Sequence, residues 1–161
     1  MRRLILTLLP ILLLVSCAGS GDLAYQSQAL CFRCSYRVGE ISLCAEVSLG
    51  ESRAGVPRDA TVTVLSPASL AGVTFTRSRG QVTVTLLCSS LSLEGEEIFC
   101  FLPLLEIALP LREKTREGDK TVLLFREGSE EYTVERLGGE ALPQRITYRG
   151  SRGELALDIL P

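Results

Sequence analysis

The sequence predicts a mainly β (α+β) fold, in which an antiparallel sheet of seven or eight strands carries one short helix. Its 161 residues fit one domain, since a domain typically has about 100 to 200 residues. Apolar and polar residues alternate in many short runs, which is typical of strands that bury one face. Threonine occupies many of the polar positions, whereas continuous apolar runs would favour a parallel sheet.

The N-terminal residues 1–16 have the features of an exported signal peptide. Met1-Arg2-Arg3 is basic, and the apolar run from Leu4 to Val15 is shorter than the roughly 20 residues that a membrane-spanning helix needs. Leu14-Val15-Ser16-Cys17 resembles the lipobox of bacterial lipoproteins. This resemblance implies that Cys17 becomes the mature N-terminus, carries a diacylglyceryl group with acyl chains such as palmitate, and anchors the chain on the extracytoplasmic side. The alternative is a secreted protein in which Cys17 is incidental.

Residues 17–29 are expected to form a lipidated tether, and residues 30–161 a single domain. The stretch Ala18–Ala29 is rich in Gly, Ser and Gln and has little periodicity, as flexible connections do. From Leu30 the alternation becomes strict. We therefore place the start of the fold there.

A β-hairpin is predicted over Leu30–Leu49, with Gly39-Glu40 as its two-residue turn, because a type II' turn takes Gly first. This turn fixes the register. The expected apolar pairs are Val38 with Ile41, Tyr36 with Leu43, Cys34 with Ala45 and Phe32 with Val47. The expected polar pairs are Arg37 with Ser42, Ser35 with Cys44 and Arg33 with Glu46.

Further strands follow a loop at Gly50–Arg58. They are expected at Ala60–Val64, in a meander from Val73 to Leu86, and in the C-terminal third at Thr121–Arg126, Glu131–Leu137, Arg145–Arg149 and Glu154–Ile159.

The one short helix is expected over Ile98–Leu109, where Glu106 is the only charge. Pro103 lies near its start, where a helix tolerates proline, and Pro110 closes it. The charged stretch Leu111–Lys120 is interpreted as a loop.

Composition excludes several classes of function. The chain has no histidine, which excludes Ser-His-Asp and Cys-His catalysis and histidine-ligated metal sites. Its net charge is −2, and loss of Arg2 and Arg3 with the signal leaves 15 bases against 19 acids, or −4. That balance favours neither nucleic acid as a partner nor adsorption of the mature domain to anionic lipids. No serine has a G-x-S-x-G context. We expect no catalytic residue, no metal and no cofactor.

Two groups of carboxylates are interpreted as solvated surface. They lack the order of a calcium loop and any apolar pocket that would shift a pKa. They are Glu94, Glu96 and Glu97, and Glu127, Glu130 and Glu131.

Cys31-Phe32-Arg33-Cys34 is a C-x-x-C motif, but it lies within a predicted strand. Residues three apart on a strand point to opposite faces, which separates the thiols and argues against a redox site. A single C-x-x-C without histidine is also weak as a zinc site. After acylation of Cys17 an odd number of thiols remains, and their pairing stays open. They are Cys31, Cys34, Cys44, Cys88 and Cys100.

From Phe32 to Ile159 the order of elements resembles the LolA/LolB-like lipoprotein family. The residues that carry the resemblance are Val64-Leu65-Ser66-Pro67 to Gly72-Val73-Thr74-Phe75, then Gln81 to Leu86, and Glu140-Ala141-Leu142-Pro143-Gln144-Arg145-Ile146. The resemblance implies a strongly curved, incomplete antiparallel β-barrel, with helix over a concave face that shelters acyl chains.

The inward apolar set is the candidate site for a lipid or other hydrophobic ligand. These residues are Phe32, Tyr36, Val62, Val64, Phe75, Val82, Val84 and Leu86. On this hypothesis the chain is a non-enzymatic, membrane-anchored lipoprotein that binds a hydrophobic molecule in the half-barrel. The alternative is a structural lipoprotein with a filled core that binds another envelope protein, with edge strands involved. The ligand, the partner, the oligomeric state and the number of membranes in the host stay open.

Overall fold

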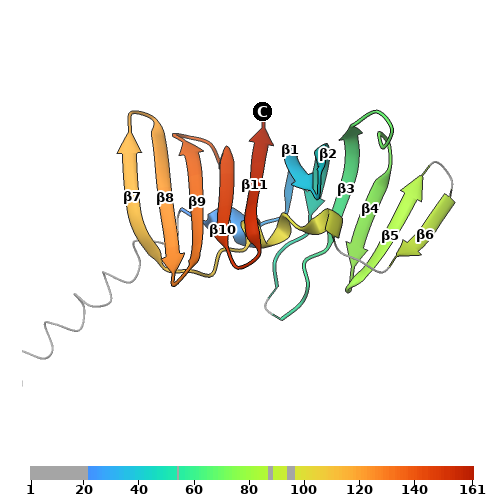
Figure 1. Cartoon of the computed structure of the whole chain (residues 1–161), viewed down its shortest axis with the longest axis horizontal. Helices are drawn as coiled ribbons and strands as arrows, with labels where there is room; N and C mark the ends of the chain where they lie inside the picture. Colours follow the sequence, from blue (N-terminus) through green and yellow to red (C-terminus); the bar gives the residue numbers. More distant parts are fainter. Residues whose placement is uncertain (1–21, 54, 87–88, 94–96) are drawn as a thin grey trace, which may run out of the picture.

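The computed structural model describes residues 22–53, 55–86, 89–93 and 97–161. The predicted signal peptide 1–16, Cys17 and Cys88 lie outside the described residues. Eleven strands form one antiparallel sheet in the order β6-β5-β4-β3-β2-β1-β11-β10-β9-β8-β7 (Figure 1). Their bounds are β1 Leu30–Val38, β2 Ile41–Leu49, β3 Ala60–Ser66, β4 Thr74–Ser78, β5 Gln81–Leu86, β6 Ser89–Leu93, β7 Leu111–Glu117, β8 Lys120–Glu127, β9 Glu130–Leu137, β10 Arg145–Gly150 and β11 Gly153–Leu160.

The predicted fold class, a curved antiparallel sheet that does not close, is confirmed. Strands β6 and β7 lie at the two ends of the order, and β1 and β2 lie near its middle (Figure 1). The sheet twists as L-amino acids require. Register shifts between Cys44 and Ala45 and between Leu111 and Glu113 add local bends, as β-bulges do.

The predicted hairpin register is confirmed at every pair. Strand β1 pairs with β2 from Leu30 opposite Leu49 to Val38 opposite Ile41. Gly39 in the turn has a φ of 59°, the left-handed region that favours glycine. The alternation of side chains thus sets the register of this pair.

The sheet has more strands than expected, and its two edge strands, β6 and β7, are among the additions. Strand β7, at Leu111–Glu117, occupies the stretch interpreted as a charged loop, and every residue in it is exposed. Strand β6 is a further addition, and its short run from Ser90 to Leu93 alternates between serine and leucine. An edge strand pairs on one side only and need not bury a face, so the sequence of β7 carries no apolar period.

The helix expected over Ile98–Leu109 takes the form of two short 3₁₀-helices, η2 (Glu97–Phe99) and η3 (Leu102–Leu105), which lie across the middle of the sheet (Figure 1). The stretch Ile98–Leu109 is apolar nearly throughout, and six of its side chains are buried. It therefore lacks the polar face that an amphipathic helix exposes to solvent. The Oη of Tyr36 donates a hydrogen bond to the Ile98 carbonyl at 2.9 Å.

The expected tether needs a correction, because the described part of it packs onto the sheet. A 3₁₀-helix, η1, spans Ala24–Ser27, and Tyr25 is buried in the core. Burial raises the pKa of Tyr25 to about 12. One tyrosine among small polar residues carries no periodic signal, so the sequence did not reveal this contact.

The loop before β3 also joins the core through Arg58, a buried guanidinium. Its Nε donates to the Gly50 carbonyl at 2.6 Å, and its Nη2 donates to the Gln28 carbonyl. Arg58 thereby ties the start of β3 to the segment before β1.

Candidate ligand-binding cleft

The predicted ligand-binding residues share one face of the sheet, which we call the core face. Cross-strand pairing aligns Phe32, Val47, Val62, Phe75 and Val84 in one row. Alternate residues of a strand point to the same face, so the two-residue alternation in the sequence groups the predicted residues on one surface.

The structure divides this set by exposure. Five of its members are buried, namely Phe32, Tyr36, Val62, Val64 and Val82. Phe75 and Val84 are half-buried, and Leu86 is 50% exposed.

The middle of the core face is filled by the chain itself. Phe101, Leu104 and Leu105 of the segment 97–107 are fully buried in the same cluster, and the ring of Phe101 lies 4.8 Å from that of Tyr36. Tyr36 therefore packs against protein and does not line an open cavity.

A cleft of about 600 Å³ opens beside this core, and we call it the rim cleft. It lies among β1, β2, β11 and the connection from β9 to β10. Its lining residues are Cys31, Phe32, Arg33, Glu46, Glu140, Ala141, Leu142, Pro143, Gln144, Ile159, Leu160 and Pro161.

Backbone hydrogen bonds fix the wall of the rim cleft formed by the β9–β10 connection. The Gln144 N–H donates to the Glu135 carbonyl at 2.8 Å, and the Ile159 N–H donates to the Gln144 carbonyl at 2.7 Å. The connection is thus held to β9 on one side and to β11 on the other.

The rim cleft combines an apolar floor with a polar margin. Phe32 and Pro143 are buried, and Leu142 and Ile159 are half-buried against the core. At the margin Arg33 and Glu46 form an exposed ion pair with a nitrogen–oxygen distance of 3.9 Å. Ligand sites typically have volumes of about 300 to 1,000 Å³, mostly apolar walls and a few polar groups, and this cleft fits that description.

Of the rim cleft's lining residues, only Phe32 belongs to the predicted set. Leu142 and Pro143 precede β10 and Ile159 lies in β11, all far from Phe32 in the chain. The run Glu140–Ile146 resembles a late strand entry, and nothing in its sequence marks it as a wall of a site.

A second cleft, of about 380 Å³, lies between β4, the segment 97–106 and the β10–β11 turn. Its two arginines already have partners. Arg77 lies over the ring of Phe99 at 5.9 Å, and Arg152 Nη2 donates to Tyr132 Oη at 3.2 Å. Being smaller and more polar, this cleft suits a hydrophobic ligand less well.

The cysteines of the C-x-x-C motif lie on opposite faces, as predicted. Cys31 is exposed and Cys34 is buried, and within the described residues Cys31, Cys34, Cys44 and Cys100 are free thiols. Burial raises the pKa of Cys34 to about 12, so it is a poor thiolate. No cluster of three potential metal-binding side chains occurs in the described parts of the chain.

Of the two carboxylate groups, Glu94 and Glu96 lie outside the described residues. Glu130 has a structural role. Its carboxylate accepts hydrogen bonds from Tyr148 Oη and, at 3.0 Å, from the Ser151 N–H. These donors lower the pKa of Glu130 to about 2.

The stability of the protein should therefore depend on this carboxylate in acid. Because its folded pKa is depressed, its contribution is present above the unfolded pKa of about 4.3 and is lost as the pH falls toward 2. We expect Glu130→Gln to flatten the fall in urea midpoint between pH 5 and pH 3. Glu131→Gln, the adjacent residue, controls for the loss of one surface charge, and an unchanged slope in Glu130→Gln would contradict the assignment.

Several solved structures are partly similar to this chain. An uncharacterised conserved protein from Thermus thermophilus is 17% identical, with a TM-score of 0.49 over 88% of this chain and 85% of that one. A putative outer membrane lipoprotein-sorting protein domain from Vibrio parahaemolyticus is 6% identical, with a TM-score of 0.42 over 87% and 88%. A LolA superfamily protein from Nitrosomonas europaea is 13% identical, with a TM-score of 0.41 over 87% and 90%.

The last two carry the family names that the sequence resembles, and each likeness is partial and concerns the fold. No protein-family model and no curated protein sequence matches this chain. Within its described residues, no helix is both long and apolar enough to cross a membrane.

Proposed function

We propose that this chain is a non-enzymatic, membrane-anchored lipoprotein that binds the apolar part of a lipid or other hydrophobic molecule in the rim cleft. The observation that carries the proposal is the cleft itself, with about 600 Å³ of space over Phe32, Leu142 and Ile159. Acylation of Cys17 would hold the domain on the extracytoplasmic side, where such molecules are exchanged with a bilayer.

The chemistry of the rim cleft favours binding over catalysis. Its apolar floor removes methylene groups from water, which stabilises a complex by about 0.8 kcal/mol for each one buried. Its charged side chains lie at the margin, and Arg33 and Glu46 pair with each other. An extended acyl chain would contact the apolar floor, and its polar head would lie beside the charged side chains at the margin.

The proposal predicts that the protein retains a hydrophobic molecule through gentle purification. Native mass spectrometry of the chain from a bacterial host should reveal an adduct of lipid mass that denaturing spectra lack. The covalent diacylglyceryl group remains in both spectra, so it is distinguished from the bound molecule. A protein that arrives bare and takes up no fatty acid or phospholipid when mixed with them would contradict the proposal.

A second candidate function, binding of another envelope protein, is favoured by the β6 edge. Leu86 in β5 and Leu91 in β6 lie on the same face of the sheet and are 50% and 64% exposed. The β6 sequence, Ser89–Leu93, has no charge, whereas β7 at the other edge carries five. Charged edge strands resist pairing with other chains, and uncharged ones accept an added strand. A bare protein whose β6 cross-links to an envelope protein would favour this function.

A further inference from the structure

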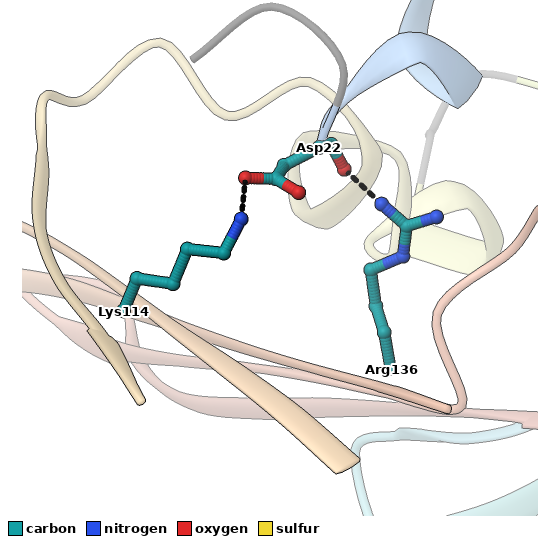
Figure 2. Close-up of polar contacts among 3 residues, drawn as sticks. All are labelled: Asp22, Lys114 and Arg136. Atoms are coloured by element: carbon teal, nitrogen blue, oxygen red, sulfur yellow. Dashed lines mark hydrogen bonds and ion pairs between the residues drawn. The ribbon is translucent and has the colours of Figure 1, made fainter. Parts of the chain in front are cut away.

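The chain that leads from Cys17 into the domain is fastened to the C-terminal half of the sheet. Lys114 Nζ donates to the Asp22 carboxylate at 2.7 Å, and Arg136 Nη1 donates to the Asp22 carbonyl at 2.7 Å (Figure 2). Arg136 also donates to the Glu140 carbonyl at 2.9 Å. Three residues after Asp22, the buried Tyr25 fixes the chain a second time. The point where the chain enters the domain is thus set by β7 and β9.

The distance from Cys17 to this point is short. Five Cα-to-Cα steps separate Cys17 from Asp22, and they span at most about 18 Å when fully extended. A domain of this size is roughly 40 Å across. If Cys17 carries lipid at the membrane surface, the region around Asp22 must lie within about 18 Å of that surface.

Near the β7–β8 turn, basic side chains of β7 and β9 project from one face of the sheet and acidic side chains from the other. Leu123 and Val134 are buried in the core, and Lys114 is opposite Leu123. Arg116, Thr121 and Arg136 form a second row on the same face, because residues directly opposite in a sheet project together. We call Lys114, Arg116 and Arg136 the basic face.

The acidic side chains of these strands near the β7–β8 turn project from the other face. They are Glu113, Glu117 and Glu135, and Lys120 on that face pairs with Glu135 at 2.8 Å. The basic face holds Asp22 as its ion-pair partner, which leaves it positive although the mature chain has an excess of acids. The surface around Asp22, where the N-terminal segment joins the domain, is therefore locally positive although the net charge after loss of the signal is −4.

We propose that the basic face lies against the anionic phospholipid headgroups of the membrane that holds the anchor. The inference rests on acylation of Cys17 in the proposed function. The short reach from Cys17 brings this face to the surface, and its charge complements anionic lipid. Each base near such a surface raises membrane affinity about fivefold, and added salt screens the effect.

The two lysines of the sequence provide a matched pair for the test. Lys114 on β7 and Lys120 on the neighbouring β8 lie on opposite faces of the sheet. Their side chains are 48% and 44% exposed, and each forms an ion pair, at 2.7 and 2.8 Å. In free solution a water-soluble acetylating reagent should modify the two amines at similar rates. Any membrane contact on one face will change the ratio of these rates.

The experiment uses the full, acylated chain on vesicles of phosphatidylcholine, with or without phosphatidylglycerol. Peptide mass spectrometry measures the acetylation of each lysine. We expect the rate at Lys114 to fall about fivefold or more relative to Lys120 on anionic vesicles only, and to recover in high salt. Arg116→Glu should reduce this protection, whereas Arg126→Glu, the same charge change on the opposite face, should leave it.

The experiment tests the orientation of the domain on the membrane and the acylation of Cys17 with separate readouts. An unchanged ratio on anionic vesicles, or equal protection on neutral ones, would overturn the contact with anionic headgroups. The mass of the N-terminal peptide reports acylation independently. A diacylglyceryl mass on Cys17 with an unchanged ratio leaves the anchor intact and rejects the orientation, while its absence rejects both.

Discussion

Replacement of Phe101 by alanine is expected to lower the free energy of unfolding by about 3 to 5 kcal/mol, the usual cost of deleting a buried aromatic side chain. Phe101 is fully buried and lies 4.8 Å from the ring of Tyr36, at a tilt of 56°. Such ring pairs contribute roughly 0.5 to 1.5 kcal/mol beyond the burial of their surface. Urea unfolding measures the loss directly.

The same variant tests whether the middle of the core face is filled. Leu91→Ala is the control, because Leu91 is 64% exposed and its truncation should change stability by less than about 0.5 kcal/mol. A loss below about 1 kcal/mol in Phe101→Ala would mean that the segment 97–107 is not a fixed part of the core. The ligand would then have a deeper site than the rim cleft.

Replacement of Leu142 by arginine should weaken binding of the hydrophobic ligand by about 10- to 100-fold. Leu142 lines the rim cleft and is half-buried, so the change removes apolar contact of about 1.5 to 3 kcal/mol and places a charge beside the acyl chain. Titration with a fluorescent fatty acid measures the affinity.

Two further variants keep this result interpretable. Leu91→Arg puts the same charge on an exposed leucine outside the rim cleft and should leave affinity unchanged. Ala141→Trp fills the cleft from an exposed loop position, so it should weaken binding even if Leu142→Arg disturbs folding. Equal affinities in all four proteins would place the ligand elsewhere.

The strands in the middle of the sheet were predictable because each buries one face. In β1 and β2 the alternation runs for nine residues on each side of Gly39-Glu40, and a shift by one residue would have placed arginine in the core. The same logic identified Phe32, Val62 and Phe75 as one surface.

The β7 edge of the sheet and the docked N-terminal segment were not predictable by this logic. Strand β7 alternates in charge, not in polarity, so it resembles a loop until its pairing with β8 is seen. Tyr25 and Arg58 are single residues whose burial depends on distant parts of the chain. Neither produces a pattern along the sequence.

The rim cleft was not predictable because it is defined by pairing across the fold. Ile159 reaches Phe32 through the alignment of β11 with β1, and Leu142 is placed by bonds from Gln144 to β9 and β11. The sequence predicts the segment that fills the core face, but as a covering helix and not as a plug of two 3₁₀-turns. This difference moves the candidate site from the middle of the half-barrel to its rim.

A photoreactive fatty acid tests most directly whether a hydrophobic molecule occupies the rim cleft. After irradiation of the complex, peptide mass spectrometry should find the label on Leu142, Pro143 or Ile159, which line that cleft. Label on Leu86 and Leu91 beside the β6 edge, or on Phe99 and Leu102 of the second cleft, would contradict the claim.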